Sequence, residues 1–455
     1  MSKEPIQPII RTDIVEFSFD DKSYAGHDGE TVAAALLRQG VIQLRDAPNT
    51  AAARGMFCVM GICQECVIEI NGKREGEILM YDAIIIGGGP AGSNAAVEAH
   101  DLGLQVLMVD EQRDAGGQIW RAKSVSILSA PPTEASMQGD ALRERVKQSG
   151  IEVKYETRVW QIDQDDEKNW IINLVGKDGS HSVRSKALII ATGAQERVIP
   201  VQGWTLPGVI GLAGATALFK EHMMVPGKST VVAGSGPLVF FVASEVIRLG
   251  GSVAAVVNIN GLSDWIKALP AMALNPKLLW QGIKWIGDLY LKRVPVYWRH
   301  GIRSFEGLGH VVGVNVRKAN NKWYLRHDPN IFIAADSVCY GHGLMPSIEA
   351  SRLAGAVHTY EPDLGGWVPF TDDNGRTTVP YLYVCGDNAG ILGAQAAPHR
   401  GRLTAYAVVE DINDALPEDI IAKRKVEEKL LKWASVFGKA ATGLSILPSG
   451  AGGLI

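Results

Sequence analysis

The pattern of apolar and polar residues divides the chain near residue 80. Before it, apolar and polar residues alternate over residues 14–19, which predicts a half-buried strand, and residues 31–39 have a helix-like pattern. After it, apolar runs such as residues 81–86 alternate with helical stretches, and a run at residues 229–236 begins the same pattern again. Uniformly apolar strands that alternate with helices are typical of parallel sheets covered by helices. We therefore expect a small first unit followed by two α/β units.

Two further stretches are predicted to be helical. Residues 265–291 are rich in apolar and aromatic side chains and have few strand signals. We interpret their tryptophans as core residues, although an exposed stripe would mark a subunit interface. Residues 413–455 are expected to form a helical tail, with Glu427, Glu428 and Lys429 on its polar face.

Composition excludes several classes of protein. Apolar residues make up 46% and charged residues 21% of the chain, which is the balance of an ordinary globular protein. The net charge of -4 gives no reason to expect nucleic acid as a partner. No apolar run approaches the roughly 20 residues that span a bilayer, and the first residues lack the apolar core of a secretory signal. We expect a cytoplasmic protein with no transmembrane segment, peripheral to the inner face of the membrane at most through its electron acceptor.

A glycine-rich turn follows the apolar strand at residues 81–86. It is the run Gly87-Gly88-Gly89-Pro90-Ala91-Gly92, and an alanine-rich helix follows it. Gly87 permits the tight turn, Gly89 lets the backbone approach a pyrophosphate, and Gly92 lets the helix pack closely on the strand. The helix N-terminus then faces the phosphates.

A carboxylate for the adenosine ribose is expected after the next strand, about 20 residues beyond the turn. That strand, residues 105–109, is followed by Asp110 and Glu111. The spacing favours Asp110 over Glu111.

Two later motifs indicate FAD as the nucleotide. The apolar strand that ends in Ala191-Thr192-Gly193 and the strand that ends in Gly386-Asp387 resemble the further motifs of flavoproteins with two dinucleotide-binding domains. The resemblance implies that Asp387 binds the ribityl chain and that the turn Gly116-Gly117-Gln118 runs beside the flavin. The alternative is an ordinary Rossmann unit with chance glycines. The expected FAD-binding residues are Gly87, Gly89, Pro90, Ala91, Gly92, Asp110, Glu111, Gly117, Gln118, Ala191, Thr192, Gly193, Gly386 and Asp387.

The second glycine turn, Gly234-Ser235-Gly236, lies where these flavoproteins carry an NAD or NADP domain. It departs from the fingerprint twice, because Val239 stands at the third glycine position and Asn258 at the position of the ribose-binding acid. The fold is expected to be kept. Binding of NAD or NADP is doubtful, and a structural domain or a site for another nucleotide is equally compatible with the sequence.

Three cysteines near the start have the spacing of a 2Fe–2S ligand set. Cys58, Cys63 and Cys66 match the plant-type C-x4-C-x2-C pattern, but the fourth cysteine that the pattern requires is absent before Cys339. A redox disulfide is disfavoured, because in the disulfide reductases that use such a cysteine pair it follows the FAD glycine turn, whereas here it precedes the turn. A zinc site would lack a fourth ligand nearby. Either another group completes the 2Fe–2S site or the cluster is lost.

Taken together, these segments resemble a family of flavin subunits. It comprises those of hydrogen cyanide synthase, opine oxidases and hydroxyproline dehydrogenases, and the large subunit of heterotetrameric sarcosine oxidase. The segments that carry the resemblance are residues 54–66, 109–120, 191–197, 203–209 and 336–343. The ferredoxin-like unit stops at Gly76, where relatives continue to a fourth cysteine, and the cysteine-rich segment that many relatives carry near the C-terminus is missing.

The expected fold is α/β, with two Rossmann-like dinucleotide-binding domains of glutathione-reductase-like type, a small N-terminal α+β ferredoxin-like unit and a helical C-terminal tail. The expected divisions are residues 1–76 for the incomplete ferredoxin-like unit, 80–200 and 331–412 for the FAD domain, 201–330 for the second nucleotide domain and 413–455 for the tail.

The resemblance implies a relay function. A partner subunit with its own flavin oxidises the C–N bond of a small amine or amino acid, and the FAD of this chain passes the electrons to an acceptor. Two alternatives stay open, namely an NAD(P)H-dependent flavin reductase acting alone and a non-catalytic flavin-binding scaffold.

The candidate catalytic residues are few. Gln118 is the better candidate for flavin contact. His399 and Arg400 either lie near the flavin pyrimidine edge or form a solvent-facing turn. His342 is placed in a loop beside the flavin cavity with a structural role, and Cys339 and Cys385 are interpreted as packed thiols.

Overall fold

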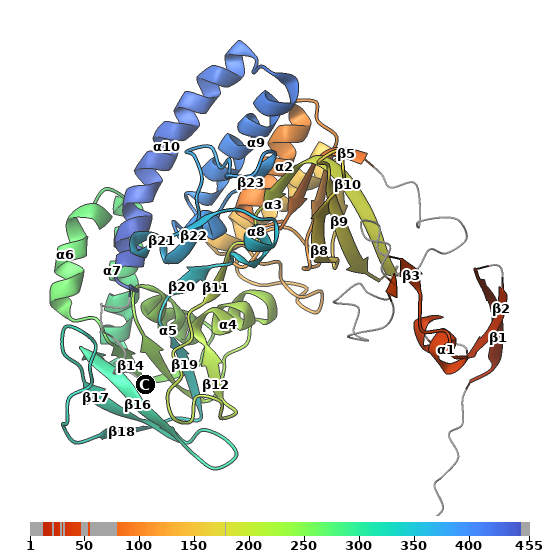
Figure 1. The fold of residues 1–455 in the computed structure, drawn as a ribbon. Coiled ribbons are helices and arrows are strands. Elements are labelled where there is room, and N and C mark those ends of the chain that lie inside the picture. The colour runs from red at the N-terminus through yellow and green to blue at the C-terminus, as the bar shows by residue number, and fades with distance from the viewer. Residues whose placement is uncertain are drawn as a thin grey trace, which may run out of the picture. The chain divides into compact units, whose positions relative to one another are not determined.

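The computed structural model describes residues 12–20, 22–27, 30, 32–46, 53–54, 80–177 and 179–446 (Figure 1). The chain divides into two compact units, Met1–Ile78 and Leu79–Ile455. Each is described by itself.

The smaller unit contains a β-hairpin and a short helix. Strand β1 (Ile14–Phe19) pairs antiparallel with β2 (Lys22–His27), and α1 (Val32–Arg38) follows. The predicted strand at residues 14–19 is therefore confirmed, and the predicted helix is present with slightly shorter bounds. Two short strands, β3 (Arg45–Asp46) and β4 (Ala53–Arg54), pair antiparallel.

The first sheet of the larger unit carries the first glycine turn. Its strand order is β7-β6-β5-β10-β9-β8, with β23 also paired to β10. The strands are β5 (Met80–Ile86), β6 (Val106–Val109), β7 (Glu152–Lys154), β8 (Arg158–Gln164), β9 (Trp170–Gly176), β10 (Gly179–Ile190) and β23 (Leu382–Val384).

The long strand β10 joins two parts of this sheet. Its second half, from Arg184 to Ile190, pairs parallel with β5, and its last three residues pair parallel with β23. Its first half pairs antiparallel with β9, and β9 pairs antiparallel with β8. The carboxyl ends of β5, β6, β10 and β23 therefore meet at one edge, which is where open parallel sheets bind their ligands.

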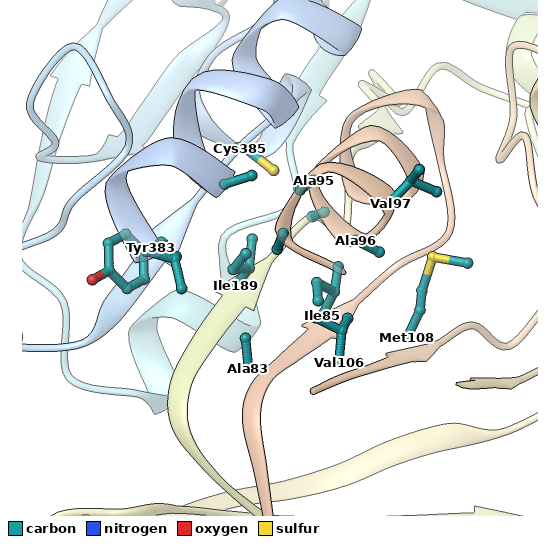
Figure 2. Close-up of a cluster of buried hydrophobic side chains, with 14 of the residues drawn as sticks. Ala83, Ile85, Ala95, Ala96, Val97, Val106, Met108, Ile189, Tyr383 and Cys385 are labelled. Carbon is teal, nitrogen blue, oxygen red and sulfur yellow. The ribbon is translucent and has the colours of Figure 1, made fainter. Parts of the chain in front are cut away.

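Helices α2 (Pro90–Asp101), α3 (Glu134–Ser149) and α9 (Ala397–Asn413) belong to the same domain. Figure 2 shows small side chains of α2, such as Ala95 and Ala96, packed on Ile85 and Ile189 of the sheet. A Cβ atom at Gly401 of α9 would overlap the Ala91 carbonyl of α2, so these helices touch through their backbones.

The second sheet is fully parallel, with the order β12-β19-β13-β14-β15. Its strands are β12 (Val209–Gly211), β13 (Ser229–Gly234), β14 (Ser252–Asn258), β15 (Val296–Trp298) and β19 (Ser337–Gly341). The helices of this region are α4 (Leu212–Ala217), the π-helix η1 (Leu218–His222), α5 (Leu238–Arg248), α6 (Leu262–Met272) and α7 (Pro276–Leu291). Strands β16 (His300–Glu306), β17 (Gly313–Lys318) and β18 (Ile331–Ala334) form an antiparallel sheet beside it.

Shorter elements connect the two sheets. They are β11 (Ala194–Glu196) paired with β20 (Leu344–Pro346), β21 (His358–Glu361) paired with β22 (Gly366–Pro369), α8 (Glu349–Leu353), and the 3-10 turns η2 (Pro362–Leu364) and η3 (Asp387–Ala389).

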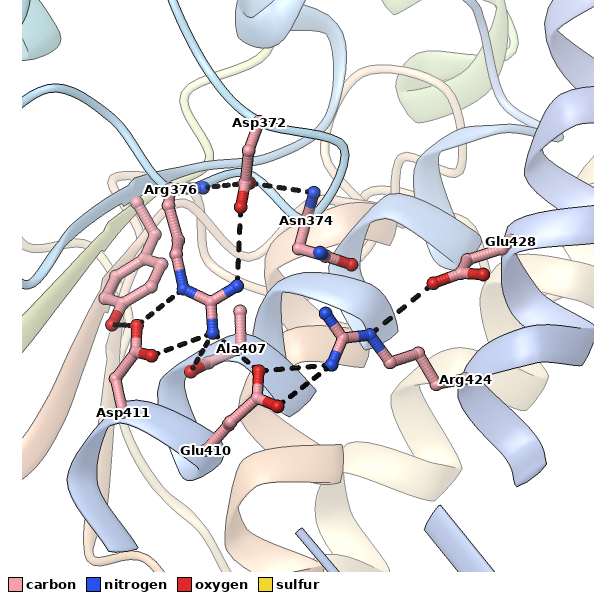
Figure 3. Close-up of polar contacts among 9 residues, drawn as sticks. Asp372, Asn374, Arg376, Ala407, Glu410, Asp411, Arg424 and Glu428 are labelled. Atoms are coloured by element: carbon pink, nitrogen blue, oxygen red, sulfur yellow. Dashed lines mark hydrogen bonds and ion pairs between the residues drawn. The ribbon is translucent and has the colours of Figure 1, made fainter. Parts of the chain in front are cut away.

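The expected helical tail is α10 (Glu418–Gly443), a long helix that packs on α9 and reaches α6 (Figure 1). An ion-pair network fastens its first half (Figure 3). Arg376 contacts Glu410 and Asp411 of α9, each at 2.7 Å, and Arg424 of α10 contacts Glu410 at 3.1 Å. Among the described residues, no helix combines the length and apolar character needed to cross a membrane.

Candidate functional site

A cavity of 1450 Å³ opens at the carboxyl edge of the first sheet. It is larger than the roughly 300–1,000 Å³ of most small-ligand pockets. All but one of the residues predicted from sequence to bind FAD line this cavity, although they come from four segments far apart in the chain. The exception is Gly92, which lies behind the turn. These segments therefore form one site large enough for a dinucleotide.

The glycine turn is tight for steric reasons. Gly87 has a φ of 107°, and a Cβ atom there would overlap the carbonyl oxygen of Ala191. A Cβ atom at Gly92 would overlap the carbonyl oxygen of Gly87, so the first turn of α2 lies directly on the strand end. Pro90 occupies the first position of α2, where its missing N–H leaves no donor unsatisfied. The N-terminus of α2 thus faces the cavity with a positive dipole end.

Asp110 and Glu111 both line the cavity but have different surroundings. Asp110 is 8% exposed and accepts hydrogen bonds from the amides of Gly88 (2.5 Å) and Gln112 (2.6 Å). Burial raises the pKa of Asp110, and these two amides oppose the increase. The side chain of Glu111 is 57% exposed and pairs with Arg158 at 3.4 Å. Only Asp110 is fixed against the glycine turn.

The turn at residues 116–118 packs on the first glycine turn. The amide of Gly116 donates to the carbonyl oxygen of Gly88 at 2.8 Å, and Gly117 has a φ of 57°. Gln118 accepts a hydrogen bond from Arg121 at 2.8 Å. The ammonium of Lys220, on the π-helix η1, donates to the carbonyl oxygen of Ile119 at 2.9 Å. Burial lowers the pKa of Lys220 to about 8.

The two later motifs close the cavity from other elements. Thr192 donates its hydroxyl hydrogen to the carbonyl oxygen of Ser347 at 3.1 Å. One carboxylate oxygen of Asp387 accepts the amides of Leu392 (3.1 Å) and Gly393 (3.0 Å), which fixes the loop before α9. Asp387 is therefore held rigidly at the cavity wall.

The interpretation of His399 and Arg400 as a solvent-facing turn is wrong. Arg400 donates to the carbonyl oxygens of Gly386 and Gly390, both at 2.7 Å, and burial lowers its pKa. It holds the Gly-Asp loop in place. His399 lines the cavity, but its Nδ1 lies 2.5 Å from Glu427 of α10.

Glu427 is shared by two partners. Arg402 donates to both carboxylate oxygens of Glu427, at 3.2 and 3.3 Å. Burial alone would raise the pKa of Glu427, but the hydrogen bond from His399 and the charge of Arg402 hold it below its usual value. His399 is therefore engaged in a hydrogen-bonded cluster with Glu427 and Arg402.

Two arginines that the sequence reasoning missed also line the cavity. Arg145 of α3 and Arg402 of α9 both donate to the side-chain oxygen of Asn94, at 2.9 and 3.1 Å. Asn94 lies one turn inside α2, so both guanidinium groups lie beside the first turns of this helix. No sequence motif contains them, and only the packing of α3 and α9 on α2 brings them together.

Three other candidates are structural. His342 is 2% exposed, lies among Tyr340 and Trp323, and is not part of the cavity lining. Its expected place beside the flavin cavity is therefore wrong, whereas its expected structural role is kept. Cys339 and Cys385 are buried free thiols whose pKa values burial raises to about 12, so their interpretation as packed thiols is confirmed.

The iron–sulfur candidates Cys58, Cys63 and Cys66 lie outside the described residues. Within the described ranges, no group of three or more potential ligands could hold a metal ion.

The cavity fits FAD in chemical terms. A helix N-terminus and two arginines suit a diphosphate, and the buried carboxylate Asp110 lies where an adenosine ribose would bind. Asp387, in the Gly386-Asp387 motif, also lines the cavity and could bind the ribityl chain of FAD.

Comparisons with known proteins agree with this chemistry. Residues 81–408 match the pyridine nucleotide-disulphide oxidoreductase family, which implies FAD, and residues 12–78 match a 2Fe-2S iron-sulfur cluster binding domain. The chain is 34% identical to an opine oxidase subunit of Agrobacterium tumefaciens over 73% of its length and 66% of that protein. It is 30% identical to the corresponding opine oxidase subunit of Rhizobium meliloti (strain 1021) over 74% of its length and 73% of that protein.

More distant relatives include the hydrogen cyanide synthase subunit HcnB of Pseudomonas aeruginosa, 26% identical over 75% of this chain and 74% of that one. The chain spans slightly less than two thirds of the first of these opine oxidase subunits, at 66%, and 63% of another from R. meliloti.

Solved structures show the same fold. L-proline dehydrogenase from P. horikoshii superposes with a TM-score of 0.56 at 20% identity, covering 92% of this chain and 78% of that one. Thioredoxin reductase from T. acidophilum gives 0.54 at 19% identity, covering 73% and 99%. These structures and the family matches confirm the expected α/β fold. The relatives named above confirm the resemblance to flavin subunits. The chain is a flavin-dependent oxidoreductase that belongs to the pyridine nucleotide-disulphide oxidoreductase family, with an N-terminal 2Fe-2S-type domain.

Proposed function

We propose that this chain is the electron-transferring flavin subunit of a dehydrogenase or oxidase that acts on the C–N bond of a small amine or amino acid. The relatives named above are subunits of an opine oxidase and of a hydrogen cyanide synthase. A further relative is the alpha subunit of sarcosine oxidase from Corynebacterium sp., 29% identical over 54% of this chain and 31% of that one. In the proposal, a partner subunit oxidises the substrate and this chain passes on the electrons.

The observation that carries the proposal is the apolar character of α7 and α10 at one end of the cavity. Beyond the expected FAD residues, its lining continues to Leu278, Gln281 and Trp285 of α7 and to Leu430 and Trp433 of α10. The face of α7 that points away from this lining is also apolar, because Trp280 is 70% and Leu291 is 82% exposed. Contiguous exposed apolar surface marks an interaction site in soluble proteins. A partner docked on this face would cover α7, the helix whose other face lines the cavity.

The polar residues of the cavity suit binding more than substrate chemistry. His399 is held by Glu427, and Arg402 is shared between Glu427 and Asn94. Lys220 holds the Gln118–Ile119 backbone in place. Bound FAD would supply electron acceptance and release, while these groups hold it and set its electrostatic surroundings.

The test compares the chain alone with a complex. The purified chain, reconstituted with FAD, is assayed with glycine, proline, sarcosine and an opine, using an artificial electron acceptor. We expect FAD binding but no turnover with any of these substrates, and turnover with one of them after co-expression with the partner flavin subunit. Substrate oxidation by the chain alone would contradict the proposal.

Two measurements on the same sample separate the alternatives. Bleaching of the flavin by NADH or NADPH would favour a self-sufficient reductase. Iron and sulfide analysis distinguishes an assembled 2Fe–2S cluster, with about two irons per chain, from a unit without iron.

A further inference from the structure

Two amides of the second glycine turn are already hydrogen-bonded within the chain. Gly234 and Gly236, at the end of β13, have φ values of 149° and 71°, as a phosphate-binding turn requires. However, the amide of Ser235 donates to the carbonyl oxygen of Gly341 at 3.2 Å. The amide of Gly236 donates to the side-chain oxygen of Asn260 at 2.9 Å. Neither N–H is available to a diphosphate.

The space above this turn is filled by the chain itself. Ser445, two residues beyond the end of α10, lies directly on it. A Cβ atom built on Gly236 would touch the Ser445 hydroxyl, and one built on Gly343 would overlap the Ser445 Cβ atom. The preceding Leu444 is buried. Ser445 therefore occupies the place between the two glycine segments where the backbone would approach a ligand.

Contacts to both nucleotide folds hold this C-terminal turn. Arg197 donates to the carbonyl oxygen of Ser445 at 2.9 Å, and Thr442 donates to the carbonyl oxygen of Ile391 at 3.1 Å. A Cβ atom at Gly438 would overlap the carbonyl oxygen of Leu392, so α10 lies against the loop that follows the Gly-Asp motif. The turn is thus fixed by the FAD domain as well as by the second domain.

The ribose position of the second fold is also unsuited to a nicotinamide nucleotide. Asn258, the last residue of β14, is fully buried, and its side-chain oxygen accepts the amide of Asn260 at 2.9 Å. The Asn258 side chain therefore supports the loop that holds the Gly236 amide. It brings no charge for a ribose hydroxyl pair.

We propose that the second nucleotide fold of this chain binds its own C-terminal turn, residues 441–446, at the position where a nicotinamide dinucleotide would place its diphosphate. The fold then serves as a rigid anchor for α10, and α10 in turn fixes the loop beside Asp387. The proposal does not depend on the identity of the substrate or of the partner.

A designed disulfide tests the position of Ser445 in the full chain. The Cβ atom of Ser445 lies 3.7 Å from a Cβ atom built on Gly236, within the roughly 3.5–4.5 Å of natural disulfides. We expect the double variant Gly236→Cys/Ser445→Cys to lose two free thiols on mild oxidation. The controls are Ser445→Cys alone and Ser445→Cys with Gly250→Cys, because a Cβ atom at Gly250 has no neighbour within 4 Å. Cross-linking no greater than in the controls would overturn the proposal.

The unmodified chain provides a second test that needs no substitution at the strained glycine. We expect calorimetric titration with NADH, NADPH or ADP-ribose to show no saturable binding tighter than about 1 mM. We also expect NADH to leave the flavin absorbance unchanged and not to slow the cross-linking of the double variant. Saturable micromolar binding of any of these nucleotides, or protection from cross-linking, would show that the turn is open and would overturn the proposal.

Discussion

At the scale of single residues, Asp110 combines two roles in one carboxylate. Both of its oxygens accept backbone amides, from Gly88 and Gln112, so it fixes the glycine turn as well as facing the cavity. In Asp110→Asn, one acceptor becomes an NH2 group that faces an N–H donor. We expect FAD to bind about 10–100-fold more weakly and the free energy of unfolding to fall by about 1–3 kcal/mol. Flavin fluorescence titration and urea denaturation measure the two effects.

The neighbouring residue supplies the matched control for this prediction. Glu111→Gln removes an exposed charge whose partner is the exposed Arg158, and surface pairs of this kind contribute about 0–1 kcal/mol. We expect an FAD affinity within about twofold of the wild type. A larger loss in Glu111→Gln than in Asp110→Asn would show that Glu111 is the ribose-binding acid.

His342 provides a pH-dependent prediction. Burial, together with the nearby charge of Arg197, lowers the pKa of His342 from 6.5 to about 3. Because the folded pKa lies below the unfolded value, the unfolded state binds more protons between these values, and stability falls as the pH falls below 6.5. Between pH 7.5 and 5.5 this histidine alone lowers the free energy of unfolding by about 1.4 kcal/mol.

The variant His342→Phe should lose this part of the pH dependence, which urea denaturation at the two pH values measures. The exposed His310 gives the control, since His310→Asn should keep the dependence of the wild type. Equal pH dependence in the wild type and His342→Phe would contradict the assignment.

At the scale of elements, the contact between α2 and α9 determines the shape of the FAD cradle. A Cβ atom at Gly401 would overlap the carbonyl oxygen of Ala91, in the first turn of α2. We therefore expect Gly401→Ala to separate the two helices, lower the free energy of unfolding by about 1–3 kcal/mol and weaken FAD binding at least about tenfold. Thermal denaturation with and without FAD measures both.

Gly282 in α7 is the matched control, because a Cβ atom there has no neighbour within 4 Å. Gly282→Ala should increase the free energy of unfolding by about 0.5–1 kcal/mol through helix propensity alone. If Gly401→Ala behaved in the same way, backbone contact between α2 and α9 would not be the constraint.

The sequence predicts those parts of the site that depend on local backbone chemistry. The turn at Gly87, the acid after β6 and the motif at Asp387 each follow a strand end, so strand and turn patterns suffice to place them on one sheet edge. Arg145 and Arg402 could not be placed in this way, because they lie on ordinary helix faces and meet only when α3 and α9 pack on α2. Likewise, nothing near Ser445 in the sequence indicates that it covers Gly236, about two hundred residues earlier.

At the scale of the whole molecule, the packing of the second domain explains only one of the two apolar faces of helices α6 and α7. The prediction that the tryptophans of this stretch are core residues holds for Trp265 and Trp285, which pack against the core of the second domain, and is wrong for Trp280, which is 70% exposed. The opposite faces of the same helices are also apolar and exposed, at Ile266, Trp280 and Ile283. A helix that is apolar on both faces has a second surface to bury, and in the proposed function the partner subunit buries it.

This interpretation makes a prediction about assembly. Large exposed aromatic residues at the centre of an interface commonly contribute at least about 2 kcal/mol to binding, or about thirtyfold in affinity. Trp280→Asp should therefore reduce co-purification with the partner subunit by at least that factor, while FAD binding and the melting temperature of the isolated chain stay unchanged, because the side chain is 70% exposed. Leu308→Asp changes an even more exposed apolar residue in the loop between β16 and β17, and should leave assembly intact. Loss of assembly in both variants would indicate a general effect of added charge, and retention in both would place the partner elsewhere on the molecule.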